Sequence, residues 1–223
     1  MAGLLMAPLA IASPLAGAQA ASPAEVLAKM DAAAAKFQSA QADFEWDQYQ
    51  KVVDEHDQQS GVISFDRKGT VTQMAARIQK PDTKLVVYKN GELELYQPNI
   101  DQLSIFAAGA NRSQFESFLT LGFGGSGKDL AATWEVSYLG NETISGVQTA
   151  KLDLKAKQES VRKMFDHVTI WVDTDRDVSL KQVFFEPSGD IRTSLFSSIK
   201  YNARIPGDVF NIKTTSKTQV VRK

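Results

Sequence analysis

The residues with the clearest potential for chemistry form a glycine-rich stretch, 122–128, which reads G-F-G-G-S-G-K. Its spacing matches phosphate-binding loops, in which backbone amides surround phosphate groups and a lysine contacts them. Such loops lie between a strand and a helix, and a Ser or Thr after the lysine holds Mg²⁺. Here Asp129 follows the lysine, and its carboxylate would repel phosphate. A helix is also predicted before the glycines, so we expect no nucleotide cofactor.

We interpret this stretch instead as a flexible turn between a helix and a strand, acting as a hinge or a cover. Glycine suits such a turn because it adopts positive φ angles at no steric cost. The glycines concerned are Gly122, Gly124, Gly125 and Gly127.

Other side chains offer little catalytic chemistry. The two histidines are His56, in a charged run that suggests a solvated turn, and His167, at the start of a predicted strand. Without cysteine they make a poor metal site, and Ser126 lacks the glycine framing of a serine nucleophile. The chain has 25 basic and 26 acidic residues, which gives no argument for nucleic acid or anionic membranes. We therefore expect neither an enzyme nor a metal or other cofactor.

The first 20 residues carry no charged side chain and end in Ala18-Gln19-Ala20. This pattern predicts a cleavable secretory signal, although the usual positive segment is missing. The alternative is a buried N-terminal helix, but two prolines interrupt the run. We expect a signal peptide at 1–20 and a single domain at 21–223, working in the periplasm. No later segment is apolar enough to span a bilayer.

Two helices are predicted from capping boxes. Ser22 and Glu25 flank the first, whose apolar residues recur at helical spacing to about Ser39. Ser113 and Glu116 begin a second, short helix that ends in the glycine-rich stretch.

The rest of the chain alternates with a period of two, which is typical of half-buried strands. Asn90-Gly91 is a strong hairpin signal, and its register places Lys89 opposite Glu92. Short strands with tight turns predict an antiparallel sheet, dry on one face and wet on the other. The dry face is either an ordinary packed core or a cavity for acyl chains. The residues that we expect to line such a cavity are Phe44, Trp46, Ile63, Phe65, Val86, Leu93 and Leu95.

The order and spacing of several segments resemble the periplasmic outer-membrane lipoprotein carriers of the LolA type. The first segments are the N-terminal amphipathic helix and the strand 61–67, G-V-I-S-F-D-R. Pro81 and the hairpin at Asn90-Gly91, followed by L-E-L-Y-Q-P at 93–98, come next. The stretches 121–130 and 185–190 complete the resemblance. It covers most of the mature chain, although no single segment is decisive.

The resemblance implies an α+β, mainly β fold: an unclosed, strongly curved antiparallel sheet of about eleven strands, lidded by short helices. It also implies that an Arg after the second strand holds the lid of the empty cavity shut, and Arg67 matches that position. Lys68 stands where the family usually has proline, and Glu94 replaces the family's hairpin tryptophan. The segment after Arg67 is also longer than usual, which makes Arg77 a rival for this role.

The resemblance implies a carrier that takes acylated lipoproteins from an inner-membrane release transporter to an outer-membrane receptor. That receptor has a similar fold but is anchored through a lipidated cysteine, and this chain has no cysteine. We therefore expect a soluble, monomeric shuttle. The alternatives are a periplasmic lipid or lipoprotein sensor of the same fold, a small extracytoplasmic hydrolase, and a purely structural sheet protein.

Overall fold

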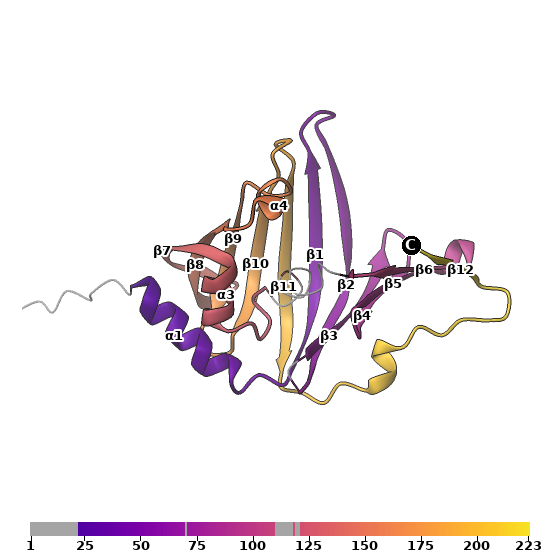
Figure 1. Cartoon of the computed structure of the whole chain (residues 1–223), viewed down its shortest axis with the longest axis horizontal. Helices are drawn as coiled ribbons and strands as arrows, with labels where there is room; N and C mark the ends of the chain where they lie inside the picture. The colour runs from indigo at the N-terminus through magenta and orange to yellow at the C-terminus, as the bar shows by residue number, and fades with distance from the viewer. Residues whose placement is uncertain (1–21, 70, 110–117, 119–120) are drawn as a thin grey trace, which may run out of the picture.

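The computed structural model describes residues 22–69, 71–109, 118 and 121–223 (Figure 1). The predicted signal peptide at 1–20 lies outside the described residues. So does the predicted helix that begins at Ser113, apart from the helical residue Phe118.

Helix α1 spans Pro23–Ala34 and confirms the predicted capping box. The Ser22 hydroxyl accepts a hydrogen bond from the Glu25 amide, and the Glu25 carboxylate accepts one from the Ser22 amide. The helix ends earlier than predicted, because Ser39 already begins a strand. Its buried residues are Val26, Met30, Ala33 and Ala34.

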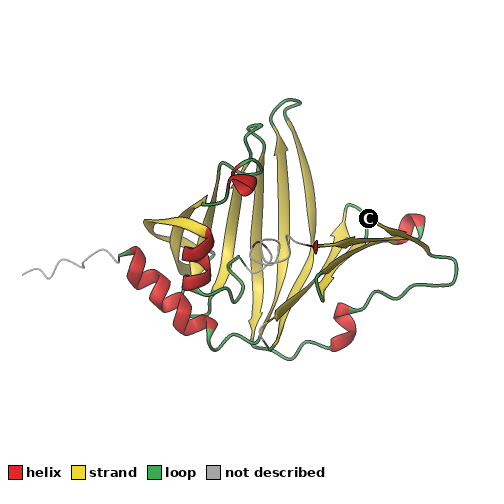
Figure 2. Ribbon diagram, viewed as in Figure 1, coloured by secondary structure: helices red, strands yellow, loops and turns green. Residues whose placement is uncertain are grey.

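The described strands form one sheet of 12 strands, ordered β12-β6-β5-β4-β3-β2-β1-β11-β10-β9-β8-β7. Neighbouring strands are antiparallel, except for β12, which runs parallel to β6. The sheet curves strongly and does not close (Figure 2), which confirms the predicted fold. The strands are β1 (Ser39–Gln50), β2 (Glu55–Lys68), β3 (Val71–Lys80), β4 (Lys84–Lys89), β5 (Glu92–Gln97), β6 (Gln102–Ala107), β7 (Trp134–Ile144), β8 (Val147–Ala156), β9 (His167–Asp173), β10 (Val178–Phe185), β11 (Ile191–Tyr201) and β12 (Gln219–Arg222).

The predicted hairpin joins β4 to β5. Asn90 and Gly91 have φ angles of 55° and 81°, as a two-residue hairpin turn requires. Lys89 pairs with Glu92 in the register, as predicted. A longer hairpin joins β1 to β2 and extends beyond the neighbouring strands (Figure 1).

Two apolar clusters lie on the concave face of the sheet. The first lies where α1 and α3 (Gly127–Thr133) pack over β7, β8 and β9, close to the short helix α4 (Glu159–Arg162). The second lies on β1, β2 and β3 beneath Phe37 and Phe123. The apolar inner face that the alternation predicted is therefore confirmed, with helices over one half of it.

The prediction of a wet outer face is wrong at two places. The chain after β11 returns across the outside of β3 and β4, where Phe210 of the 3-10 helix η3 (Gly207–Phe210) packs on Ala75 and Val87. On β9, Trp171 is also buried, between the ammonium groups of Lys151 and Lys181. Contacts between segments that are distant in sequence therefore exclude water from parts of the outer face.

Candidate functional site

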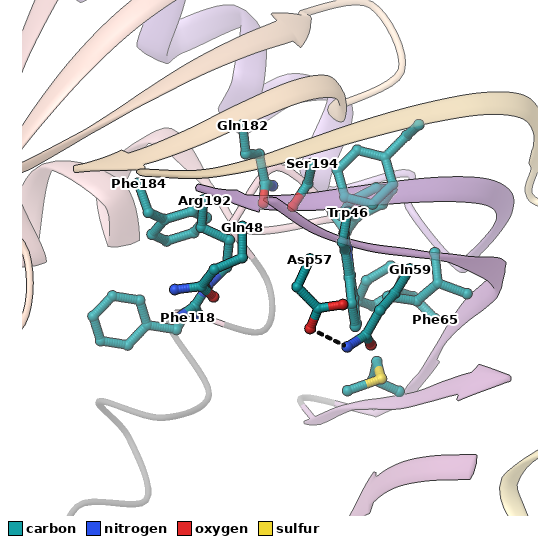
Figure 3. Close-up of a pocket in the computed structure, with 14 residues that line it drawn as sticks. Trp46, Gln48, Asp57, Gln59, Phe65, Phe118, Gln182, Phe184, Arg192 and Ser194 are labelled. Carbon is teal, nitrogen blue, oxygen red and sulfur yellow. Dashed lines mark hydrogen bonds between the residues drawn. The ribbon is translucent and has the colours of Figure 1, made fainter. Parts of the chain in front are cut away.

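A cavity of about 430 Å³ opens on the concave face of the sheet (Figure 3). This volume falls in the range of small-molecule sites. Its walls come from β1, β2, β3, β10 and β11, together with Phe118 and Phe123. The lining residues are Trp46, Gln48, Asp57, Gln59, Ile63, Phe65, Met74, Phe118, Phe123, Gln182, Phe184, Arg192, Ser194 and Phe196.

Three of the residues predicted from the sequence, Trp46, Ile63 and Phe65, line this cavity. Phe44 lies behind it, almost fully buried, with its ring centroid 4.3 Å from that of Trp46. The structure does not bring the remaining predicted residues to the cavity wall. Val86 and Leu93 pack at the edge of the same apolar cluster, and Leu95 is half-buried on β5.

The floor of the cavity depends on aromatic residues that the sequence did not single out. Phe123 stacks on Phe65 with 4.2 Å between ring centroids, and it meets the edge of Phe196 at 4.9 Å. Phe123 follows the first glycine of the glycine-rich stretch, so this stretch builds the cavity. An apolar residue within a glycine-rich run was the signal in the sequence that could have identified Phe123 as part of the cavity wall.

We call α1, α3 and the loop 121–126 the cover. The loop is attached to β10 by backbone hydrogen bonds: the Ser179 amide donates to the Gly122 carbonyl at 2.6 Å, and the Gly124 amide donates to the Asp177 carbonyl at 3.2 Å. Gly124 has a φ angle of 78°, and a Cβ atom there would clash with the Phe37 ring. Only glycine fits this position without rearrangement.

Arg67 ties the cover to β2. Its Nη1 donates to the carbonyl of Ala34, the last residue of α1, at 2.6 Å, and its Nη2 donates to the Gly124 carbonyl. The guanidinium also lies over the Phe37 ring, 5.3 Å from the centroid. A fixed fork of donors suits one side chain to bridge two separate carbonyls. Arg67 therefore contacts both the helical and the loop part of the cover.

Arg77, the rival candidate, occupies a different environment. It is exposed on β3 and lies on the outer face, beside Gln41 and Val62. It makes no contact with the cover in the described part of the chain. The geometry thus favours Arg67 over Arg77 as the residue that holds the cover.

The glycine-rich stretch does not form a phosphate site. A helix follows the glycines, contrary to our expectation of a strand, but side chains already occupy its first amides. The Lys128 amide donates to the Asp31 carboxylate at 3.0 Å, and the Asp129 amide donates to the Ser126 hydroxyl at 3.1 Å. The hollow beside it measures only about 40 Å³. Gly122 and Gly124 have the predicted positive φ angles.

Asp177, just before β10, is fully buried beneath the cover, and neither carboxylate oxygen has a hydrogen-bond partner among the described residues. Burial raises the pKa of this carboxyl from 3.8 to about 8. The positive charge of Arg67 opposes the rise, and the negative charge of Asp31 adds to it. Asp177 is therefore protonated and uncharged at neutral pH.

The histidines lie apart and contact single carboxylates. His56 is on β2, not in a turn as predicted, and its Nδ1 lies 2.9 Å from Asp47. His167 begins β9, where it stacks on Phe185. In the part of the chain that the structure describes, no group of three or more His, Cys, Asp or Glu could hold a metal ion. None of the described helices is long and apolar enough to cross a membrane.

Similar solved structures share this fold at low sequence identity. An uncharacterized conserved protein from Thermus thermophilus is 12% identical, with a TM-score of 0.57 over 90% of this chain and 98% of that chain. A chain of the MucA/MucB complex of Pseudomonas aeruginosa is 14% identical, with a TM-score of 0.53 over 86% of this chain. This chain spans 61% of that chain, less than two thirds of its length.

A LolA superfamily protein from Nitrosomonas europaea is 16% identical over 86% of this chain and 99% of that chain. Its TM-score is 0.42. No protein-family model matches the sequence, and no curated protein matches it either. The similarities establish the fold of the chain and no finer relationship.

Proposed function

We propose that this protein is a periplasmic carrier that shields the acyl chains of lipoproteins and shuttles them from the inner to the outer membrane. The observation that carries the proposal is the cavity on the concave face, lined by aromatic rings and bordered by a cover that Arg67 holds. The role rests on the fold and this geometry together. A release transporter in the inner membrane and a receptor in the outer membrane are its proposed partners.

The energetics of acyl chains in water require such a carrier. Each CH₂ group moved from an apolar environment into water costs about 0.8 kcal/mol, so a long chain cannot cross an aqueous compartment unprotected. In the proposed carrier, the rings of Phe65 and Phe196 on the sheet and of Phe123 in the cover supply the apolar environment. We also assign Phe44, Val86, Leu93 and Leu95 to the surface that becomes available when the cover moves away.

Release at the destination requires that binding is reversible, and Arg67 supplies the opposing free energy. Its two hydrogen bonds form only while the cover is closed over β2, so cargo that lifts the cover must break them. A hydrogen bond to a charged group contributes roughly 1.5–3 kcal/mol. This free energy is subtracted from the affinity for cargo, which helps the loaded carrier to give up its lipid.

Replacing Arg67 tests this role. We expect Arg67→Leu to accept lipoprotein but to transfer it poorly, with retention raised about ten- to a hundredfold because the closed state no longer competes. Native mass spectrometry of protein purified from the periplasm measures the fraction that carries lipid or lipoprotein. Arg77→Leu, on the outer face, is the matched control and should resemble the wild type.

Two results would contradict the proposal. If neither the wild-type protein nor either variant is ever found with acylated cargo, the carrier function is ruled out. Cargo that is carried and transferred equally by all three proteins would leave the carrier function standing and make Arg67 a structural residue only.

A second candidate is a sensor that binds a partner protein. It is favoured by the similarity to MucB, whose solved structures include a complex with MucA. In this case a partner protein would bind to the periplasmic domain, and lipid would alter that binding. Pull-down of a stoichiometric partner protein that is not itself acylated, and whose binding changes when lipid is added, would support the sensor instead of the carrier.

A further inference from the structure

The cavity wall changes from apolar to polar along the strands. Nearest the cover, Phe44 on β1 is paired with Phe196 on β11 and with Gly61 on β2. Two residues further along β1, Trp46 is paired with Ser194 and Gln59. Residues two apart on a strand share a face and lie about 7 Å apart. The inner face is therefore not uniformly apolar.

The next row is mostly polar. Gln48 is paired with Arg192 on β11 and with Asp57 on β2, while Arg192 is paired with Phe184 on β10. In Figure 3 the polar side chains of both rows lie between Phe118 and Phe184 on one side and Trp46 and Phe65 on the other. We call them the polar rows, and their members are Gln48, Asp57, Gln59, Gln182, Arg192 and Ser194.

Several hydrogen-bonding groups of the polar rows remain available. The side-chain carbonyl of Gln48 accepts a hydrogen bond from Arg192 Nε at 3.1 Å, and the protons of its side-chain amide make no hydrogen bond to the described residues. Gln182 donates to the Leu121 carbonyl, and its own carbonyl has no described partner. Ser194 is 5% exposed, and its hydroxyl makes no hydrogen bond within the described chain. The polar rows thus offer both donors and acceptors to a ligand in the cavity.

The charges of the polar rows disfavour an anionic ligand. The cation, Arg192, already pairs with Glu186 at 3.0 Å. Asp57 is a carboxylate whose hydrogen-bond partner is the neutral Gln59, at 3.4 Å. A ligand carboxylate or phosphate would approach the Asp57 carboxylate, while the lining cation, Arg192, is already paired with Glu186, and like charges repel. An uncharged polar group meets no such repulsion.

We infer that the cavity selects acyl chains joined to an uncharged ester or amide over free fatty acids. The chain lies over Phe65, Phe123 and Phe196, and the ester or amide carbonyl accepts from the Gln48 amide or the Ser194 hydroxyl. An amide-linked ligand also donates to the Gln182 carbonyl. This inference rests on the proposed function and defines its substrate class: chains whose carboxyl group is esterified or amidated.

Competition with a fluorescent apolar probe, N-phenylnaphthylamine, tests the selection on the wild-type protein. The competitors are palmitamide, methyl palmitate and palmitate, which share one chain and differ in the head group. We expect the amide and the ester to displace the probe at roughly tenfold lower concentration than palmitate, because each gains a hydrogen bond and avoids repulsion. Palmitate that competes as well as the ester would overturn the inference.

Variants locate the effect in the polar rows. Ser194→Ala and Gln48→Leu should reduce the advantage of the amide and the ester while leaving binding of the probe itself. Asp57→Asn should strengthen the binding of palmitate but not that of the amide or the ester, because it removes the negative charge of the acidic residue that lines the cavity. Gln41→Leu is the control. Gln41 lies on β1, as Gln48 does, but on the outer face, where its side chain donates a hydrogen bond to Ser64.

The two proposals fail in different ways. Probe binding with no preference among the competitors, and no change in the variants, would overturn this inference and leave an acyl-chain carrier. Absence of binding by the probe and by all three competitors would overturn the proposed function as well.

Discussion

At the scale of single residues, Asp177 is the described side chain whose buried polar atoms have no hydrogen-bond partner in the described part of the chain. Its carboxyl group is buried beside Arg67 and Asp31. Leaving a buried polar group unsatisfied is costly, and the cost is larger for a charged carboxylate than for the neutral acid. Burial therefore favours the protonated form and raises the pKa of Asp177 to about 8.

The raised pKa of Asp177 makes stability depend on pH. Between the unfolded value of 3.8 and the folded value of about 8, the folded protein holds a proton that the unfolded chain has released. The free energy of unfolding therefore falls as the pH rises through this window, by about 1.4 kcal/mol per pH unit from this group. Below the window, and again above it, the contribution is constant.

Asp177→Asn should remove this slope. Asparagine is uncharged at every pH and tolerates the positive φ of 53° at this position. We expect the variant and the wild type to differ little near pH 4, and the variant to be more stable by several kcal/mol near pH 8. Denaturant unfolding across this pH range measures the difference. Parallel profiles for the two proteins would show that Asp177 is ionised in the folded state.

At the scale of elements, the helices of the cover meet with almost no space between them. A Cβ atom on Gly127, the first residue of α3, would lie 2.2 Å from the Leu27 carbonyl oxygen of α1. The helices can approach this closely only because position 127 has no side chain. This contact, rather than a flexible turn, explains the glycine.

Gly127→Ala should push α1 and α3 apart. We expect a loss of roughly 1–3 kcal/mol in the free energy of unfolding, typical of overpacking in a closed interface. Gly207→Ala is the control, because a Cβ atom at Gly207 meets nothing within 4 Å. Chemical denaturation of both variants checks the expectation; equal stability would mean that the helices separate without cost.

The sequence predicted the elements that follow a simple period and missed those that do not. The N-cap of α1 and the Asn90-Gly91 turn are local signals, and both were confirmed. Helix α3 was missed because glycine dominates its start, although Ser126 and Asp129 form its cap. Such a cap is a local signal that could have been recognised.

The polar rows were missed for a different reason. On β11 the inward residues Arg192 and Ser194 are polar, whereas Leu195, between Ser194 and Phe196, faces outward and is 41% exposed. This order inverts the pattern by which an apolar inner face is recognised. A functional site is where such an inversion is expected, and only the strand register shows that these residues share the cavity with Trp46.

At the scale of the whole molecule, the two faces of the sheet have separate tasks. The concave face holds the cavity and the cover. The convex face is stabilised by the C-terminal segment 202–218, which packs through Phe210 and leads to β12 at the sheet edge. A second hollow, of about 800 Å³, opens where β3 ends at Lys80 and the first residues of β2 extend beyond it, and it is lined mostly by polar residues. This arrangement keeps stabilising contacts away from the site.

Phe210→Ala should therefore reduce stability without reducing ligand binding. Phe210 is 2% exposed, and deleting such a ring costs about 3 kcal/mol in an apolar core. The cavity on the opposite face should bind N-phenylnaphthylamine with wild-type affinity wherever the variant is folded.

Val52→Ala, at the tip of the β1–β2 hairpin where the side chain is 89% exposed, should change neither stability nor probe binding. Thermal unfolding and probe titration measure the two effects separately. Weaker probe binding by folded Phe210→Ala would show instead that the C-terminal segment shapes the cavity through the sheet, because the curvature of β3 and β4 would then depend on the packing behind them.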